Sequence, residues 1–146
     1  LAVECALLIS LSTHFLLKQL SPPAILVELT AYIKQPSLIQ RLDVINDWLT
    51  TGYLATPKEI IRLLGHGVTA ESSCPTALYV AFSHLHHPFE QMLSLIIQCG
   101  GDVDTIAAMA GTLWGTANGY KQLPKIIIED YQRLLSVAEG VEKFVR

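Results

Sequence analysis

The chain contains the segment Cys99-Gly100-Gly101-Asp102-Val103-Asp104-Thr105, which runs directly into the apolar segment Ile106-Ala107-Ala108-Met109-Ala110. The two glycines permit backbone conformations that other residues rarely adopt. The apolar residues that follow have helical spacing and predict a helix over residues 104–118. Two carboxylates and a hydroxyl packed into such a junction are oxygen ligands of the kind that Mg²⁺ or Ca²⁺ prefers. The junction therefore predicts a helix start and a candidate site for a hard cation.

A helix cap is the alternative interpretation of the same residues. Aspartate is a favoured N-cap residue, so Asp104 would cap the helix while Gly100 and Gly101 only turn the chain. A cap needs one oxygen, however, whereas this junction offers three. The helix dipole also repels a cation at this end, so a metal there requires carboxylates whose charge outweighs that field. Asp102 and Asp104 would supply the charge.

Small residues recur at every fourth position of the helix that follows the junction: Ala107, Gly111, Gly115 and Gly119. Glycine costs about 1 kcal/mol relative to alanine inside a helix, so three of them need a reason. We expect another backbone to approach this face closely, as small-residue faces usually allow. Packing the helix deep in a core would hold its N-terminal aspartates rigidly.

The remaining sequence predicts further helices joined by short breaks. The spacing of apolar residues indicates helices over residues 2–20, 22–34, 37–50, 57–64, 75–85 and 89–98, and a last amphipathic helix from after Pro124 to near Val145. Ser21 is expected to cap the second helix, and Thr56 and Glu59 have the spacing of a capping box. Pro36 is expected to break the pattern, and no alternating pattern predicts a strand. The fold class is therefore all-α, with one helical domain over residues 1–146.

The composition indicates a piece of a larger domain. The chain has 146 residues, of which 51% are hydrophobic and 16% charged, with a mean hydropathy of +0.40. A domain of this size leaves much of its surface in water, so we expect other parts of the same protein to cover some of this apolar surface. The opening Leu1-Ala2-Val3 already lies inside an apolar pattern. The net charge of −3, without a basic cluster, argues against direct binding of nucleic acid.

Cysteine usage and segment lengths indicate an intracellular protein without a membrane span. The three cysteines, Cys5, Cys74 and Cys99, are widely spaced and fit neither a disulfide framework nor a zinc site. The apolar segment from Ala2 to Leu17 carries Glu4 and is short for a membrane span.

Three other groups of polar residues have simpler explanations. His66, between two glycines, is a candidate catalytic base, but the sequence shows no orienting partner for it, and a loop between helices is the alternative. His84 and His87 share a helical face without further zinc ligands at the right spacing. Asp43 and Asp47 lie four residues apart and indicate a solvated helix face.

Two segments together carry a resemblance to a known family. The segment Leu64-Gly65-His66-Gly67-Val68-Thr69-Ala70-Glu71-Ser72-Ser73-Cys74-Pro75-Thr76-Ala77-Leu78-Tyr79 resembles the "G-x-G-V-A-x-E-S-x-P-x-A-L-Y" region of ADP-ribosylglycohydrolases. The segment from Gly100 to Gly111 resembles their "G-G-D-T-D-T-I-A-x-M-A-G". The resemblance covers about residues 59–120 and is closest to the branch that removes ADP-ribose from serine and degrades poly(ADP-ribose).

The resemblance implies an orthogonal multi-helix fold, of which this chain is the C-terminal portion, and a site for two Mg²⁺ ions, with Mn²⁺ as a substitute. Metal ligands of the family fall on Asp102, Asp104 and Thr105. Gly67, Val68 and Gly101 fall where the family contacts its substrate. Val103 replaces a threonine that is not a ligand, and His66 stands where asparagine is common.

The resemblance also implies that half of the site lies outside this chain. The family's N-terminal half supplies an acidic residue near a Gly-Asp pair, a "T-D-D-T" ligand set and a Gly/Asn-rich phosphate-binding loop, and the general acid or base is expected there. The expected partners are that N-terminal half and ADP-ribose or an ADP-ribosylated protein. The chain would then supply half of a site that hydrolyses O-glycosidic ADP-ribose linkages, and alone it would be inactive. The alternative is a non-catalytic or truncated relative that serves as a structural or interaction module.

Overall fold

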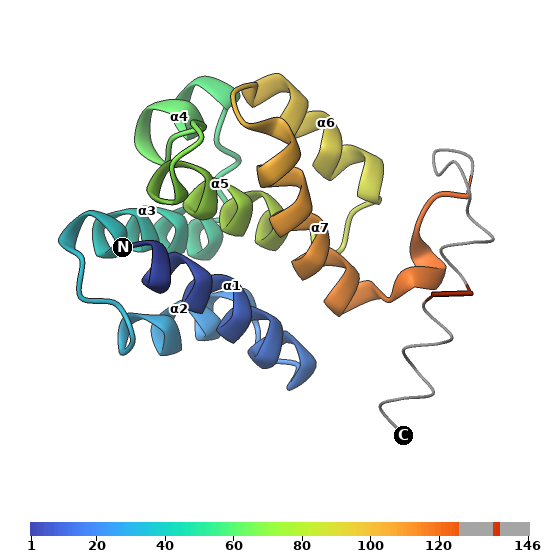
Figure 1. Cartoon of the computed structure of the whole chain (residues 1–146), viewed down its shortest axis with the longest axis horizontal. Helices are drawn as coiled ribbons and strands as arrows, with labels where there is room; N and C mark the ends of the chain where they lie inside the picture. Colours follow the sequence, from blue (N-terminus) through green and yellow to red (C-terminus); the bar gives the residue numbers. More distant parts are fainter. Residues whose placement is uncertain (126–135, 138–146) are drawn as a thin grey trace.

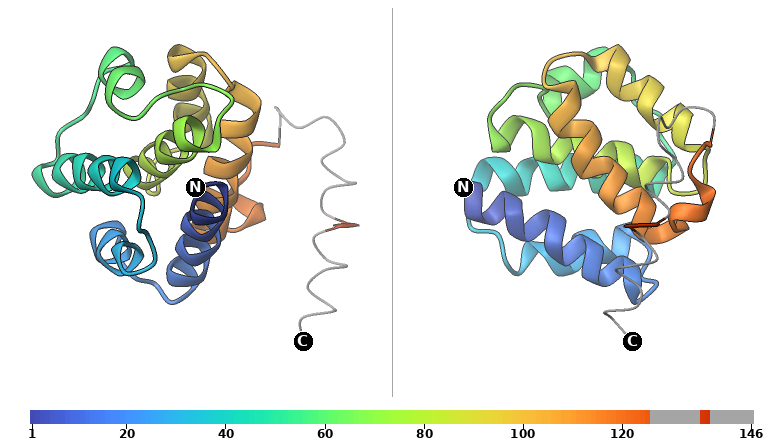
Figure 2. Two further views of the ribbon diagram at one scale, coloured as in Figure 1. Left: turned by 60° about the vertical axis from the view of Figure 1, so that its left-hand side comes forward. Right: turned by 45° about the vertical axis from the view of Figure 1, so that its right-hand side comes forward.

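The part of the chain that the structure describes, residues 1–125 and 136–137 of a computed structural model, consists of helices and their connections. Its elements are α1 (Ala2–Leu17), α2 (Pro22–Thr30), α3 (Pro36–Thr51), α4 (Pro57–Leu63), α5 (Ala70–Ser83), α6 (Phe89–Cys99), α7 (Val103–Asn118) and the 3₁₀ helix η1 (Tyr120–Gln122). The helices run in several directions (Figures 1 and 2). Because no strand occurs among the described residues, the all-α prediction is confirmed.

Helix α5 is the centre of the packing. It contacts α1, α3, α6 and α7, and every residue from Ser73 to Phe82 is buried. The Tyr79 hydroxyl accepts a hydrogen bond from the backbone N–H of Ala55 at 3.0 Å, and the ring packs edge-on against Trp48 at 4.9 Å between centroids. Leu78 and Tyr79, at the end of the segment 64–79 that carries the family resemblance, therefore belong to the core.

Most predicted helix starts are confirmed. The capping box of α4 is complete, because the Thr56 side chain accepts from the Glu59 N–H and the Glu59 carboxylate accepts from the Thr56 N–H. Ser21 occupies the N-cap position of α2, although its side chain makes no capping hydrogen bond. The expected break at Pro36 is present, because α2 ends at Thr30, and Pro36 is itself the first residue of α3. Proline suits the first turn of a helix, where its missing N–H would have no partner.

The prediction that a helix begins at Pro75 is wrong by five residues. Helix α5 begins at Ala70 and keeps Pro75 in its interior. Proline has no N–H to donate to the carbonyl four residues earlier, which is that of Glu71. The Arg41 guanidinium of α3 donates to this carbonyl instead, and it also lies 3.5 Å from the Glu71 carboxylate. A contact from a distant helix thus allows the helix to continue through proline.

Arg41 and Pro75 should therefore be energetically coupled. We expect Arg41→Ala to lower the free energy of unfolding by about 2 kcal/mol, the usual range for a charged hydrogen bond. In a Pro75→Ala background the restored N–H satisfies the Glu71 carbonyl, so Arg41→Ala should cost clearly less. Denaturant unfolding of both single variants and the double variant measures this coupling. Equal costs of Arg41→Ala in the two backgrounds would contradict this explanation.

Two helices end earlier than their apolar patterns. Helix α1 ends at Leu17 rather than residue 20, because Gln19 takes up a left-handed conformation with φ of 60°. Helix α2 ends at Thr30 rather than residue 34, and the segment that follows it is tied down by the Glu4 carboxylate, which accepts from the N–H of Lys34 at 2.7 Å. The predicted last helix, up to residue 145, lies almost entirely outside the described residues.

Among the described residues, no backbone approaches the glycine face of α7 closely, contrary to the prediction. Within that part of the chain, a Cβ added at Gly111 would meet only the Phe89 ring, at an ordinary 3.7 Å, and one added at Gly115 or Gly119 would meet nothing within 4 Å. Helix α7 instead buries its large side chains, among them Leu113 and Trp114, in the core. This burial still fixes the helix rigidly.

Surface features agree with two further predictions. Asp43 and Asp47 are both exposed on α3. Of the helices in the described ranges, none combines the length and the apolarity needed to cross a membrane.

Candidate metal and ligand site

The segments 64–79 and 100–111, which carry the family resemblance, contact each other through two loops. The Asp102 N–H, at the start of α7, donates to the His66 carbonyl at 2.8 Å. Gly101 adopts a positive φ of 74°, and a Cβ added there would lie 1.9 Å from the His66 oxygen. No other residue fits this position without moving one of the loops. The contact between the two segments is therefore built into the backbone.

The first loop, residues 65–69, is held by the start of α5. The Gly67 N–H donates to the Ser72 hydroxyl at 2.8 Å, and the Thr76 hydroxyl donates to the Gly65 carbonyl. Gly65 has a φ of +96°, and a Cβ there would lie 2.4 Å from the Ser72 Oγ. Internal hydrogen bonds and close packing thus fix the loop before any ligand binds.

The predicted ligands Asp102, Asp104 and Thr105 lie together at the N-terminus of α7. Asp102 occupies the N-cap position but makes no capping hydrogen bond, and Asp104 and Thr105 are exposed in the first turn. The helix-cap interpretation of Asp104 is therefore wrong. Asp104 accepts from the Thr105 N–H at 3.0 Å. A hydrogen bond with the Asp102 side chain, and then that N–H, lower the pKa of the Asp104 carboxyl.

This donor set fits part of a hard-cation site. Two carboxylates and a hydroxyl are oxygen ligands suited to Mg²⁺ or Mn²⁺, and octahedral Mg²⁺ takes about six ligands. Within the described ranges, no group of three or more His, Cys, Asp or Glu side chains is arranged to hold a metal ion. The three side chains at α7 can thus hold a cation only when further ligands come from water, substrate or another segment.

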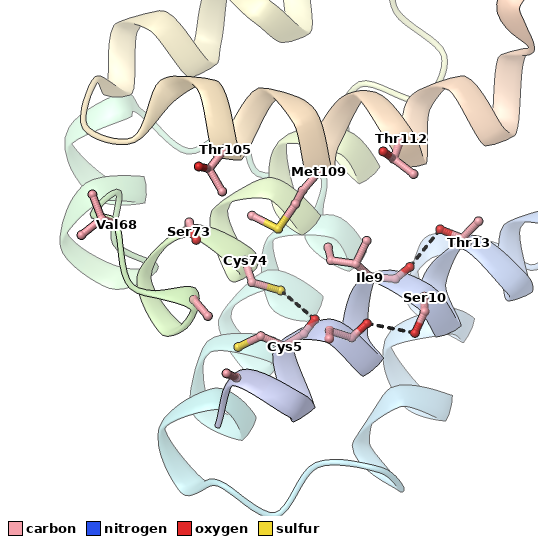
Figure 3. A pocket seen from close by; sticks show the side chains of 13 residues that line it. Cys5, Ile9, Ser10, Thr13, Val68, Ser73, Cys74, Thr105, Met109 and Thr112 are labelled. Carbon is pink, nitrogen blue, oxygen red and sulfur yellow. Dashed lines mark hydrogen bonds between the residues drawn. The ribbon is translucent and has the colours of Figure 1, made fainter. Parts of the chain in front are cut away.

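A groove of about 730 Å³ lies between α1 and α7 and over the start of α5. Figure 3 shows Thr105, Met109 and Thr112 on the α7 side and Ile9, Ser10 and Thr13 on the α1 side. Small side chains such as Ala2, Ala6 and Ser73 line much of the rest. Of the three candidate metal ligands, Thr105 lines this groove, and Asp102 and Asp104 do not.

The predicted substrate residues divide into two kinds. Val68 is 84% exposed and lines the groove, as Thr105 does. Gly67 and Gly101 do not line it: the Gly67 N–H is used within the loop, and Gly101 packs against His66. Direct contact of the two glycines with substrate stays a prediction. Their observed contacts shape the loops that carry Val68 and Asp102.

Two buried cysteines, Cys5 and Cys74, line the groove. The Cys74 thiol donates to the Cys5 carbonyl at 3.5 Å, and both thiols are free and buried (Figure 3). The hydrogen bond with Cys5, together with burial, raises the pKa of the Cys74 thiol. This thiol stays protonated, so it is not a nucleophile.

Sequence reasoning missed two parts of this region. The contribution of α1 to the groove carries only a weak signal, small residues four apart at Ala2, Ala6 and Ser10. It also missed the partner of His66, because the Cys99 carbonyl that its Nδ1 contacts is 33 residues away. The rings of His84 and His87 do lie together, with centroids 5.4 Å apart, but no third ligand joins them in the described part.

Comparisons with known proteins agree with the resemblance. The chain is 34% identical over 90 residues to ADP-ribosylhydrolase ARH3 of Xenopus tropicalis, an alignment covering 53% of this chain and 25% of that protein. It is 36% identical over 80 residues to ADP-ribosylhydrolase ARH3 of Homo sapiens, covering 48% and 22%. The Mus musculus protein of the same name is 36% identical over 77 residues, covering 47% and 21%.

The matched part of the chain thus spans a quarter or less of the length of these relatives. The model of one protein family, described as ADP-ribosylglycohydrolase, matches residues 1–145, nearly the whole chain. The chain therefore belongs to the ADP-ribosylglycohydrolase family.

Proposed function

We propose that the protein containing this chain is a metal-dependent hydrolase of O-glycosidic ADP-ribose linkages, and that this chain supplies half of its binuclear Mg²⁺ site. The observation that carries the proposal is the docking of the two loops through the Asp102 N–H and the His66 carbonyl. Thr105 and Val68 line the same groove, and Asp102 and Asp104 precede Thr105 at the start of α7. Membership of the family and the names of the ARH3 relatives support the same reaction.

Each residue has a role that follows from its place. The carboxylates of Asp102 and Asp104 and the hydroxyl of Thr105 would hold one side of the metal pair, in which Mn²⁺ can replace Mg²⁺. Bound divalent ions orient the substrate and act as Lewis acids at the bond to be broken. Val68 would pack its exposed side chain against the ADP-ribose. The general acid or base would come from residues outside this chain, because no side chain at the groove in the described part is suited to that role.

The apolar groove between α1 and α7 would be covered by the remainder of the same protein. Its lining is made mostly of small side chains, which allow a helix to approach closely. The ARH3 relatives are about four times as long as the matched part, and so have ample chain for this purpose. Serine-linked ADP-ribose and poly(ADP-ribose) are the proposed substrates.

The test is the release of ADP-ribose from a serine-linked peptide by the full-length protein, with and without divalent cation. We expect release to require Mg²⁺ or Mn²⁺. The rate of release should fall by more than about 100-fold in Asp102→Ala, which is the typical loss when one group that stabilises charge in an active site is removed. Asp47→Ala, which removes an exposed carboxylate from α3, should leave release unchanged. If Asp102→Ala retains wild-type release and metal affinity, Asp102 is not a metal ligand and the proposal is wrong. If the wild-type protein releases no ADP-ribose, the alternative of a non-catalytic structural or interaction module is favoured.

A further inference from the structure

His66 makes contacts with both ends of the turn that joins α6 to α7. Its carbonyl accepts from the Asp102 N–H at 2.8 Å, and its Nδ1 lies 2.9 Å from the Cys99 carbonyl oxygen. A carbonyl only accepts, so Nδ1 must carry a proton and donate. One residue therefore acts as acceptor for the start of α7 and as donor for the end of α6.

Both of these backbone groups lack a partner within their own helices. Cys99 is the last residue of α6, where a carbonyl finds no N–H of the following turn. Asp102 is the N-cap of α7, so its N–H is likewise left over. Cys99 is 3% exposed, so an unmet carbonyl there would carry a desolvation cost. His66 therefore provides a hydrogen-bond partner for both of these backbone groups.

The same turn carries the candidate metal ligands. Asp102 follows Gly101, whose α-carbon packs against the His66 backbone and imidazole, since an added Cβ would lie 2.7 Å from Nδ1. A shift of the turn would therefore move the Asp102 carboxylate and the first residues of α7 with it. Partners that orient metal ligands typically affect metal affinity by about 10- to 100-fold when they are removed.

We propose that His66 is a positioning residue, which fixes Asp102 through the hydrogen bond from its Nδ1 to Cys99. The expected effect on metal binding rests on the proposed function. The fixing of the turn by His66 does not depend on it. The Nδ1 of histidine and the Nδ2 of asparagine are both two bonds from Cβ, so asparagine can present an N–H at the same place.

Three substitutions at this position separate the hydrogen bond from packing. His66→Asn keeps an N–H donor, His66→Leu keeps bulk without a donor, and His66→Ala removes both. In the full-length protein without metal, we expect hydrogen exchange of the Asp102 amide to accelerate about fivefold or more in the Leu and Ala variants. His66→Asn should exchange like the wild type, and so should the control His86→Ala, which changes an exposed histidine.

Mn²⁺ titration of the same proteins gives the second readout. The Leu and Ala variants should bind about 10- to 100-fold more weakly, and the Asn variant should stay close to the wild type. Nitrogen-15 NMR of the wild type should find the neutral ring protonated at Nδ1, whether or not any variant folds.

An unprotonated Nδ1, or wild-type exchange at Asp102 in His66→Leu, would overturn the proposal. If the wild type binds no Mn²⁺, the proposed function fails, while the exchange and NMR results still decide the role of His66.

Discussion

Gly101→Ala is expected to separate the two loops and to destabilise the protein by about 2–5 kcal/mol. A positive φ of 74° costs alanine about 1–2 kcal/mol relative to glycine. The new Cβ would also lie 1.9 Å from the His66 oxygen. Relief of this overlap breaks the hydrogen bond to the Asp102 N–H and leaves polar groups unsatisfied, which adds about 1–3 kcal/mol. Denaturant unfolding measures the loss, and metal titration should show weakened binding.

Gly52→Ala is the matched control for this prediction. Gly52 ends α3 with a similar φ of 71°, but a Cβ there would meet no described residue within 4 Å. We expect it to cost only the conformational part, about 1–2 kcal/mol, and to leave metal binding unchanged. If Gly101→Ala costs no more than Gly52→Ala, the close approach of the two loops does not exist in solution.

Asp104→Ala is expected to weaken Mn²⁺ binding more than any change to a neutral ligand. The positive end of the α7 dipole opposes a cation, so binding depends on the negative charge of the two aspartates. Removal of one carboxylate should weaken Mn²⁺ binding by more than about 100-fold, beyond the typical effect of residues that only orient ligands. Thr105→Val, which removes a neutral oxygen but keeps a similar shape, should cause a smaller loss. Calorimetric titration of the full-length variants compares them.

The test lies in the relative size of the losses of Mn²⁺ affinity among these variants. Asp47→Ala removes the same charge from an exposed position on α3 and should not change the affinity. Equal losses in Asp104→Ala and Thr105→Val would contradict the electrostatic explanation. Wild-type affinity in Asp104→Ala would remove this residue from the metal site altogether.

Much of the fold could be predicted from the sequence, because the signals for helix starts lie within a few neighbouring residues. The capping box at Thr56, the proline at the start of α2 and the glycine pair before α7 each act within a few residues. The start of α5 could not be predicted in this way. Pro75 is a reliable helix breaker only when nothing else satisfies the carbonyl it exposes, and here Arg41 of α3 does so.

In the candidate site too, local features could be predicted from the sequence, whereas contacts between distant segments could not. Its ligand types and their spacing at Asp102, Asp104 and Thr105 are visible in the sequence. The environment of the glycine face of α7 could not be predicted, because glycine spacing does not show whether a neighbour approaches, and no described residue does so at Gly115. The bridging role of His66 and the groove along α1 depend on contacts between distant segments, which a single sequence does not reveal.

Crystals of the full-length protein grown with Mn²⁺ allow the metal to be located by its anomalous scattering. Because the carboxylates of Asp102 and Asp104 and the Thr105 hydroxyl supply one side of the proposed site, the map should show a peak coordinated by these three side chains. The remaining ligands should come from water and from residues outside this chain. A map in which Mn²⁺ binds elsewhere, or in which the start of α7 carries no peak at saturating Mn²⁺, would contradict this assignment.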